Sequence, residues 1–110
     1  MAKPKIEDFT HNQVELAAFF KALSHPARIA ILQYLSSSNS CITGTISSSL
    51  PLSRTTVNQH LEILKSLDLI KGHISGVNTK YCINPEKIAD FSTKLIQFLE
   101  TIKTINYDCE

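Results

Sequence analysis

The sequence predicts a mainly α-helical domain with one small β-hairpin, in the order helix, helix, helix, helix, hairpin, helix. Three observations support this fold class. Apolar residues recur at helical spacing through the first 67 residues, two short strand-like segments surround a glycine-containing turn, and a long amphipathic segment follows Pro85. The 110 residues are 43% hydrophobic and 19% charged, which is typical of one globular domain spanning residues 1–110.

The first two helices are predicted on either side of the sequence SHP. Leu16 and Phe20 share one face of a helix within residues 13–23. Pro26 suits the first position of the second helix, because the backbone N–H that proline lacks is not needed there. An apolar stripe continues to Leu35, and the turn-prone sequence SSSNS then predicts a loop.

A third, short helix is predicted at residues 43–50. Ile42, Ile46 and Leu50 recur every four residues, and Thr43 would be its N-cap. The sequence PLS then turns the chain. Ser53 is a suitable N-cap for a fourth helix, whose apolar positions are Val57, Leu61, Leu64 and Leu67.

The opposite side of the fourth helix carries long or forked hydrogen-bonding side chains. Arginine can pair with guanine, asparagine and glutamine can pair with adenine, and threonine can bond phosphate, which is the chemistry of major-groove recognition. An isolated helix of this kind usually has only a solvated face. Here a short helix, a three-residue turn and this fourth helix form a helix-turn-helix, and a hairpin follows where a wing would lie, which favours DNA contact.

Separate roles are expected for the residues of this face and of the hairpin. Residues 53–80 hold four Lys or Arg against two acids, a local balance of +2 in a chain of net charge +1. Residues expected to read bases are Arg54, Thr55, Asn58 and Gln59. Residues expected to favour the DNA backbone are Ser53, Thr56, Lys65, Lys71 and Lys80. His60, His73 and Asn78 complete the expected DNA-binding set.

The last helix, predicted at residues 85–105, has an apolar seam of nearly three heptads. Its members step by three and four residues: Ile88, Phe91, Leu95, Phe98, Ile102 and Ile105. Ile96 and Leu99 lie off this seam, so the helix is apolar on more than one side. That pattern favours two partners, the helix's own domain and a second copy of the chain.

The segments FKALSHPARIAILQYL and LSRTTVNQHLEILKSLDLI, with the hairpin ending in KYCIN, resemble the ArsR/SmtB family of winged helix-turn-helix transcriptional repressors. The resemblance runs from about residue 13 to about residue 103. It implies a homodimer whose two recognition helices enter successive major grooves of a palindromic operator in double-stranded DNA, until a signal releases them. It also implies a dimer interface formed by residues 13–23 and 85–105. The expected interface residues are Leu16, Phe20, Ile88, Phe91, Leu95, Phe98 and Ile102.

Many members of that family sense metals, through cysteines at the start of the third helix or through histidine and carboxylate ligands on the last helix. Alignment on Ser53 places Ile42 and Gly44 at the positions of those cysteines. The last helix contains Asp90 but no histidine. We therefore expect no metal site and no cofactor.

The three cysteines indicate neither a disulfide framework nor a zinc knuckle, because they are far apart and odd in number. A thiol-sensing repressor is nevertheless an alternative, with Cys41 and Cys109 as the candidate pair. The favoured interpretation is that cysteine acts as a small apolar residue, as Cys82 would in a strand.

Other function classes are less well supported. A winged-helix protein-interaction module is the second alternative, because the hairpin is only weakly basic. An enzyme is not expected, since no nucleophile and base occur in a recognised arrangement and no phosphate-binding loop is present. The sequence has no signal-peptide core and no apolar run long enough to span a membrane, so a cytoplasmic protein is expected.

Overall fold

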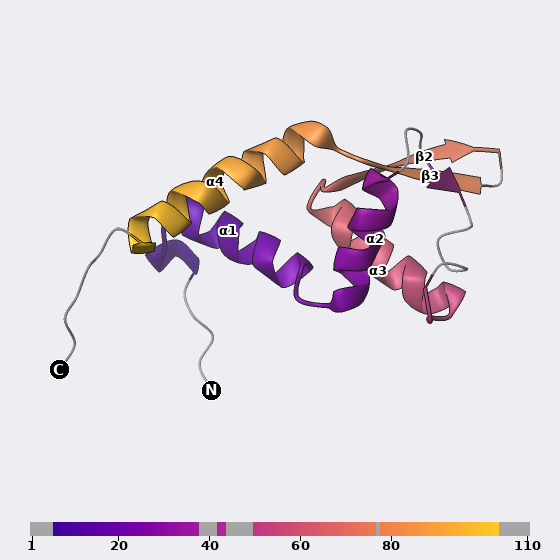
Figure 1. Cartoon of the computed structure of the whole chain (residues 1–110), viewed down its shortest axis with the longest axis horizontal. Coiled ribbons are helices and arrows are strands. Elements are labelled where there is room, and N and C mark those ends of the chain that lie inside the picture. Colours follow the sequence, from indigo (N-terminus) through magenta and orange to yellow (C-terminus); the bar gives the residue numbers. More distant parts are fainter. Residues whose placement is uncertain (1–5, 38–41, 44–49, 77, 104–110) are drawn as a thin grey trace.

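The computed structural model describes residues 6–37, 42–43, 50–76 and 78–103 (Figure 1). Its elements in chain order are the 3-10 helix η1 (Ile6–Asp8), α1 (His11–Ala22), α2 (Pro26–Ser36), β1 (Ile42–Thr43), α3 (Arg54–Ser66), β2 (Ile70–Ser75), β3 (Asn78–Ile83) and α4 (Pro85–Lys103). The molecule is elongated, measuring 58 × 34 × 26 Å. Figure 1 shows α1 and the C-terminal part of α4 at one end, with α2, α3 and the strands at the other.

Local capping explains where α1 and α2 begin. The Thr10 hydroxyl accepts a hydrogen bond from the Gln13 N–H, and the Gln13 side chain accepts one from the Thr10 N–H. This capping box starts α1 two residues before the predicted boundary. The Nδ1 atom of His25 accepts a hydrogen bond from the Ala27 N–H at 3.0 Å, which caps α2 in front of Pro26.

The prediction for α3 is confirmed. Ser53 is the N-cap, and its hydroxyl accepts a hydrogen bond from the Thr56 N–H at 3.2 Å. Three predicted apolar positions, Val57, Leu61 and Leu64, are buried. These contacts hold one side of α3 against the rest of the domain.

The turn after α3 directs the chain into the hairpin. Asp68 has a φ of 60°, a left-handed conformation that aspartate tolerates better than most residues. The side-chain amide of Asn84 donates to the Asp68 carbonyl at 2.9 Å, and the Asn84 N–H donates to the Leu69 carbonyl at 3.0 Å. The entry and exit of the hairpin are therefore tied together beside the start of α4.

The predicted hairpin is confirmed, but it belongs to a three-stranded sheet. β2 pairs antiparallel with β3, from Ile70 opposite Ile83 to Ser75 opposite Asn78. β1 pairs with the other edge of β3, which gives the order β1-β3-β2. The prediction that Thr43 caps a helix is wrong, because Thr43 lies in β1 opposite Lys80. A free edge of β3 offers unpaired backbone groups, and β1 satisfies some of them. The remainder of the predicted third helix, residues 44–49, lies outside the described residues.

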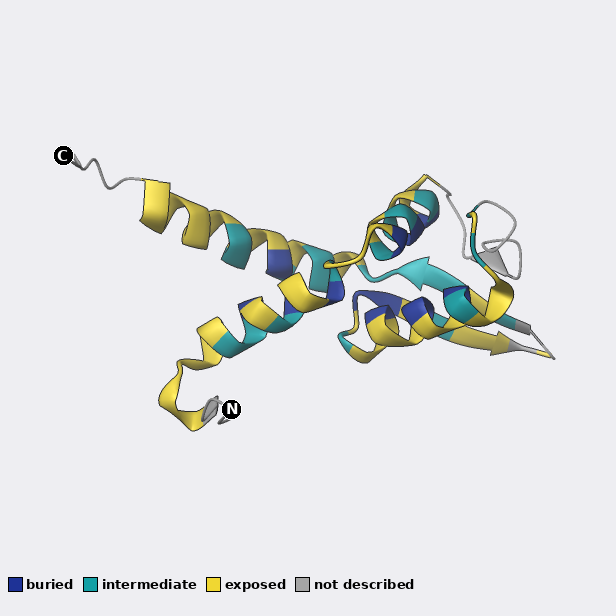
Figure 2. Ribbon diagram, turned by 90° about the horizontal axis from the view of Figure 1, so that it is seen from below, coloured by how far each residue is buried: buried dark blue, intermediate teal, exposed yellow. Residues whose placement is uncertain are grey.

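The core joins the four α-helices to the start of the hairpin. Its buried members are Leu16, Phe19, Ala22, Ile31, Leu35, Val57, Leu61, Leu64, Leu69, Ile70 and Phe91. Figure 2 shows these buried positions along the inner surfaces of the helices, while the C-terminal turns of α4 are exposed. The rings of Phe19 and Phe91 lie with centroids 4.6 Å apart, which packs α4 against α1.

This packing buries part of the predicted dimer seam within the chain itself. Leu16 and Phe91 belong to the chain's own core, and Ile88 and Leu95 are partly buried against it. Of the seven expected interface residues, those that remain exposed are Phe20, Phe98 and Ile102.

Candidate nucleic-acid interface

The side of α3 that faces away from the core is polar and exposed. Arg54 and Asn58 are four residues apart, as are Thr55 and Gln59, so each pair lies in one row along the helix. All four side chains are exposed. The structure therefore brings the four predicted base-reading residues together on one accessible helix face.

Ser53 and Thr56 lie at the N-terminal end of the same helix. The Ser53 hydroxyl donates to the Thr56 hydroxyl oxygen at 3.0 Å, in addition to its role as the cap. Ser53 is exposed and Thr56 is partly buried. The first-turn N–H groups and the positive end of the helix dipole at this point favour a nearby anion such as phosphate.

Cations surround the hairpin. Lys71, His73 and Lys80 are exposed, and His73 lies directly opposite Lys80 across the two strands. Successive residues of a strand point to opposite faces, so these three side chains share one face of the hairpin. The side chain of Asn78 lies outside the described part of the structure, although its backbone belongs to β3.

Lys65 approaches the other face of the hairpin. A Cβ atom placed on Gly72 would stand 3.4 Å from Lys65 Cε and 3.4 Å from Thr79 Cγ2. The absence of a side chain at Gly72 thus leaves room for the aliphatic part of Lys65 to lie across the strand. Positive charge is present on both sides of the wing.

His60 does not belong to the exposed face on which it was expected. Its side chain is 8% exposed, and its Nδ1 atom accepts a hydrogen bond from Arg28 Nε at 3.1 Å. Burial, together with the nearby His25 and Arg28, lowers the pKa of His60 below its ordinary value. The expected DNA contact is corrected to an internal one, because His60 lies three residues after Val57 and thus on the buried stripe.

Arg28 is not among the residues whose function was predicted from the sequence, yet it makes three side-chain hydrogen bonds. Its Nη1 atom donates to the carbonyl oxygens of Lys21 at 3.0 Å and Ala22 at 3.3 Å. Arg28 therefore links the end of α1 and the start of α2 to His60 on α3. Its position could have indicated a role, because Arg28 lies in the first turn of α2. A cation there is disfavoured by the helix dipole, so another interaction must stabilise it.

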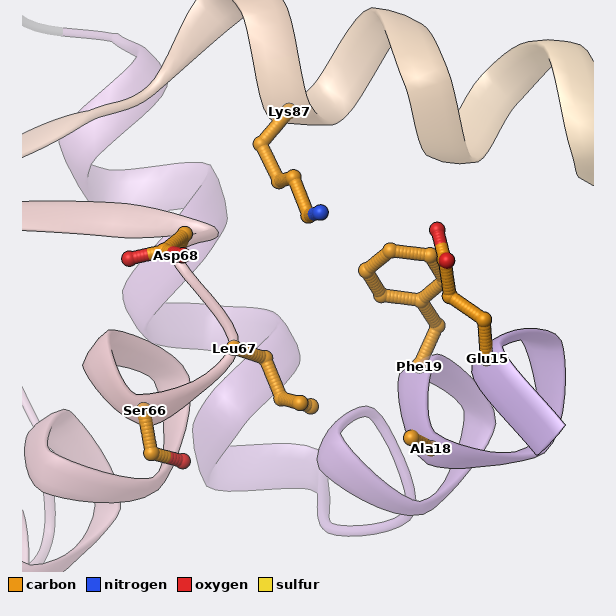
Figure 3. A pocket seen from close by; sticks show the side chains of 7 residues that line it. All are labelled: Glu15, Ala18, Phe19, Ser66, Leu67, Asp68 and Lys87. Atoms are coloured by element: carbon orange, nitrogen blue, oxygen red, sulfur yellow. The ribbon is translucent and has the colours of Figure 1, made fainter. Parts of the chain in front are cut away.

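A pocket of about 180 Å³ lies between α1, the end of α3 and the start of α4. Figure 3 shows its lining residues: Glu15, Ala18, Phe19, Ser66, Leu67, Asp68 and Lys87. The Lys87 ammonium lies 5.6 Å from the centroid of the Phe19 ring, within the range of a cation–π interaction. The contact between Lys87 and Phe19 joins the start of α4 to α1, and no nucleophile and base are paired among the lining residues.

Ion pairs also connect α1 to α4. Lys94 bonds the carboxylates of Glu15 and Asp90, and Glu15 also pairs with His11 at 3.1 Å. The hydrogen bond to Glu15, followed by that to Asp90, raises the pKa of Lys94. The hydrogen bond from Lys94 is the main reason that the pKa of Asp90 is lowered. Asp90, considered above as a possible metal ligand, thus forms an ion pair with Lys94.

Two further features concern the described residues alone. Within them, no three His, Cys, Asp or Glu side chains are grouped closely enough to hold a metal ion. No helix in the same ranges is both long and apolar enough to cross a membrane. Cys41 and Cys109, the candidate thiol pair, lie outside the described residues, and Cys82 is partly buried in β3.

Comparison with known proteins agrees with this geometry. Residues 23–73 match the protein family "Helix-turn-helix domain". The chain is 30% identical over 80 residues to the transcriptional repressor SdpR of Bacillus subtilis (strain 168), and the match covers 73% of this chain and 88% of that protein. The fold is similar to that of an ArsR-like transcriptional regulator from Rhodococcus sp. RHA1, with a TM-score of 0.69, 24% identity, and coverage of 91% of this chain and 100% of that chain. The chain belongs to the ArsR/SmtB-like family of winged helix-turn-helix transcriptional regulators.

The regulator also resembles Mb0332 from Mycobacterium bovis, whose solution NMR structure is of a homodimeric winged helix-turn-helix DNA-binding domain. The TM-score is 0.64 at 22% identity, and the match covers 100% of this chain and 99% of that chain. Membership of the family makes the chain a DNA-binding transcription regulator and not an enzyme. Within the fold, α3 lies in the segment that matches the helix-turn-helix domain, and β2 and β3 form the hairpin that follows α3 and is called the wing.

Proposed function

We propose that this regulator is a homodimeric repressor that binds a palindromic operator through α3. The exposed polar face of α3 is the observation that carries the proposal, because it places Arg54, Thr55, Asn58 and Gln59 together on a helix whose other side is buried. The relatives support it: SdpR is a transcriptional repressor, and the Mb0332 domain is homodimeric. Two copies related by a two-fold axis would present two α3 helices to a symmetric DNA site.

The proposed contacts divide by chemistry. Arg54 would pair with guanine, and Asn58 and Gln59 with adenine, each good bidentate pair contributing about 1–3 kcal/mol of discrimination. Thr55 would contact a base edge or a thymine methyl. Backbone contacts are assigned to Ser53, Thr56, Lys65, Lys71, His73 and Lys80. His60 is left out, because it is buried.

The exposed apolar side of α4 supports the dimer. Among the described residues, four of the nine exposed large hydrophobic side chains lie on this helix: Ile96, Phe98, Leu99 and Ile102. Phe20 of α1 is also exposed, and its ring lies edge-on to that of Phe98 at 6.3 Å. A soluble monomer rarely leaves such a patch uncovered, so we assign it to a second copy.

Selection of bound duplexes from a random pool tests the proposal. A palindromic sequence recovered with wild-type protein would establish DNA binding, two-fold symmetry and half-site spacing together. In the same selection, Arg54→Ala and Gln59→Ala are expected to alter the preferred bases, while Lys80→Ala is expected to weaken binding to all sequences alike. Recovery of no sequence preference by the wild type, or uniform losses from all three variants, would contradict the assignment.

A protein-interaction module is the second candidate, and Ile74 is the observation that favours it. This wing residue is 86% exposed, which is unusual for a large apolar side chain on a DNA-facing element. Salt dependence separates the two candidates. If Arg54, Lys65, Lys71 and Lys80 of both protomers contacted phosphate, the log–log salt slope would be at most about −7. An interaction module would bind duplex DNA weakly and with little change in affinity between low and moderate salt.

A further inference from the structure

His60 is a buried titratable residue on the helix that is proposed to read DNA. Its ring lies against that of His25, with the centroids 4.4 Å apart and the planes inclined by 46°. His25 is the N-cap of α2, whereas His60 lies in the middle of α3. The two imidazoles therefore form a contact between α2 and α3 that the proposed operator contacts do not use.

Both imidazoles act as hydrogen-bond acceptors through Nδ1. His60 Nδ1 accepts from Arg28 Nε at 3.1 Å, and His25 Nδ1 accepts from the Ala27 N–H at 3.0 Å. An imidazole nitrogen accepts only when it carries no proton, so each bond requires a neutral ring with its proton on Nε2. Protonation of either ring would place a hydrogen on Nδ1 and remove the corresponding bond.

Arg28 extends this contact to α1. The same guanidinium that donates to His60 also donates to the carbonyl oxygens of Lys21 and Ala22 at the end of α1. Arg28 thus bonds to the last turn of α1 and to the middle of α3 while its own backbone lies in α2. A bond from a planar guanidinium constrains direction as well as distance, so it limits how α3 can rotate relative to α1.

The surroundings of His60 disfavour a positive charge on its ring. The titratable or charged side chains that act on it are His25 and Arg28, both of which are basic. α1 contributes the backbone carbonyls of Lys21 and Ala22, and these are occupied by Arg28. Among the described residues, no carboxylate influences the His60 pKa. A protonated His60 would therefore face two cationic or potentially cationic neighbours with no opposite charge to offset them.

We propose that Arg28, His25 and His60 form a proton-sensitive clamp that positions α3 for DNA binding and releases it when His60 is protonated. This inference rests on the proposed role of α3 as the recognition helix. Arg28 and the two histidines are positioning residues in it, because they act on the helix and not on DNA. Histidine is the side chain whose ordinary pKa, about 6.5, allows such a change near neutral pH. The lowered pKa of His60 keeps the clamp closed at neutral pH.

The clamp predicts a pH dependence opposite in sign to that of an ordinary DNA-facing histidine. An exposed histidine beside phosphate gains positive charge on protonation, so its contribution to phosphate binding increases as the pH falls. Protonation of His60 would break the bond to Arg28 and weaken DNA binding as the pH falls. Substitution of His73 by glutamine removes the opposing contribution and leaves that of the clamp.

The test measures affinity of the full-length chain for its selected duplex by fluorescence anisotropy, at constant ionic strength, from about pH 7.5 to about pH 5.5. In a His73→Gln background, affinity is expected to fall more than about threefold over this range, because the free protein takes up a proton on His60 that the closed clamp excludes. In the same background, we add His60→Gln, whose amide oxygen can accept a hydrogen bond from Arg28 but does not titrate. The affinity of this variant is expected to change by no more than about twofold between the two pH values. His11→Gln is the matched control, since His11 is exposed on α1 and is expected to retain the full response.

Equal pH responses with and without His60→Gln would overturn the clamp. Loss of duplex binding at every pH in the wild type would instead overturn the proposed function. A second measurement uses the wild-type protein and therefore does not depend on any variant folding. The nitrogen chemical shifts of the imidazoles report the protonation state and tautomer of each ring. We expect His60 at about pH 7.5 to be neutral with its proton on Nε2. A proton on Nδ1 at that pH, or a pKa above about 6.5, would also overturn the clamp.

Discussion

Leu99→Ala is predicted to weaken the proposed dimer without destabilising the monomer. Leu99 is 45% exposed on α4 and is not part of the core. Complete burial of a leucine side chain contributes about 1.5–3 kcal/mol, so covering its exposed half is worth about 1 kcal/mol. Each dimer contains two copies of the residue, which makes the expected loss about 2 kcal/mol and the increase in dimer Kd about 30-fold.

Sedimentation equilibrium over a concentration series measures this change. Ile29→Ala is the matched control, because Ile29 is also 45% exposed but lies on α2, away from the apolar side of α4. We expect the control to dimerise as the wild type does, and both variants to retain the helical circular dichroism of the parent. An unchanged dimer Kd for Leu99→Ala, or an equal increase for Ile29→Ala, would refute the assignment of this surface.

Three further predictions concern the core, the wing and the buried histidine. Phe91→Ala should lower the free energy of unfolding by about 3–5 kcal/mol in urea titrations, since Phe91 is buried against Phe19, whereas Phe98→Ala should cost clearly less in monomer stability. A comparable loss from both would show that α4 packs differently. Lys80→Ala should reduce the magnitude of the log–log salt slope by about two for a dimer, measured by DNA binding across a salt series; an unchanged slope would remove Lys80 from the phosphate contacts. Because the pKa of His60 is lower in the folded state, the unfolded chain binds more protons below about pH 6.5, and stability should fall as the pH drops through this range. Urea titrations at about pH 7.5 and about pH 5.5 should show this loss, and His60→Gln should reduce it; an equal loss in the variant would assign it to other groups.

The elements that could be predicted from sequence are those set by local interactions. α3 begins at its predicted cap, because the Ser53 hydroxyl needs only the Thr56 N–H three residues away. Its apolar stripe could be identified because helical spacing places Val57, Leu61 and Leu64 on one side whatever they pack against. The exposed face of α3, and with it the base-reading half of the candidate site, follows from the same spacing.

The features that could not be predicted depend on distant partners. β1 exists because the edge of β3, nearly forty residues later, offers backbone groups to Ile42 and Thr43. The role of His60 depends on Arg28, which lies 32 residues away in the sequence. Histidine is common on surfaces and in interiors alike, so its type alone did not distinguish a DNA contact from a buried acceptor.

The last helix shows most clearly the difference between what the sequence determines and what the tertiary structure determines. Its sequence determined that α4 is long, helical and apolar on more than one side, because those properties depend on spacing within one segment. Tertiary packing decided which side of α4 faces the chain's own core, because the ring of Phe91 packs against that of Phe19. That contact turns Leu99 and Ile102 outward, where a second copy can cover them. Apolar surface is buried wherever a complementary surface is available, and only the folded structure determines where that surface lies.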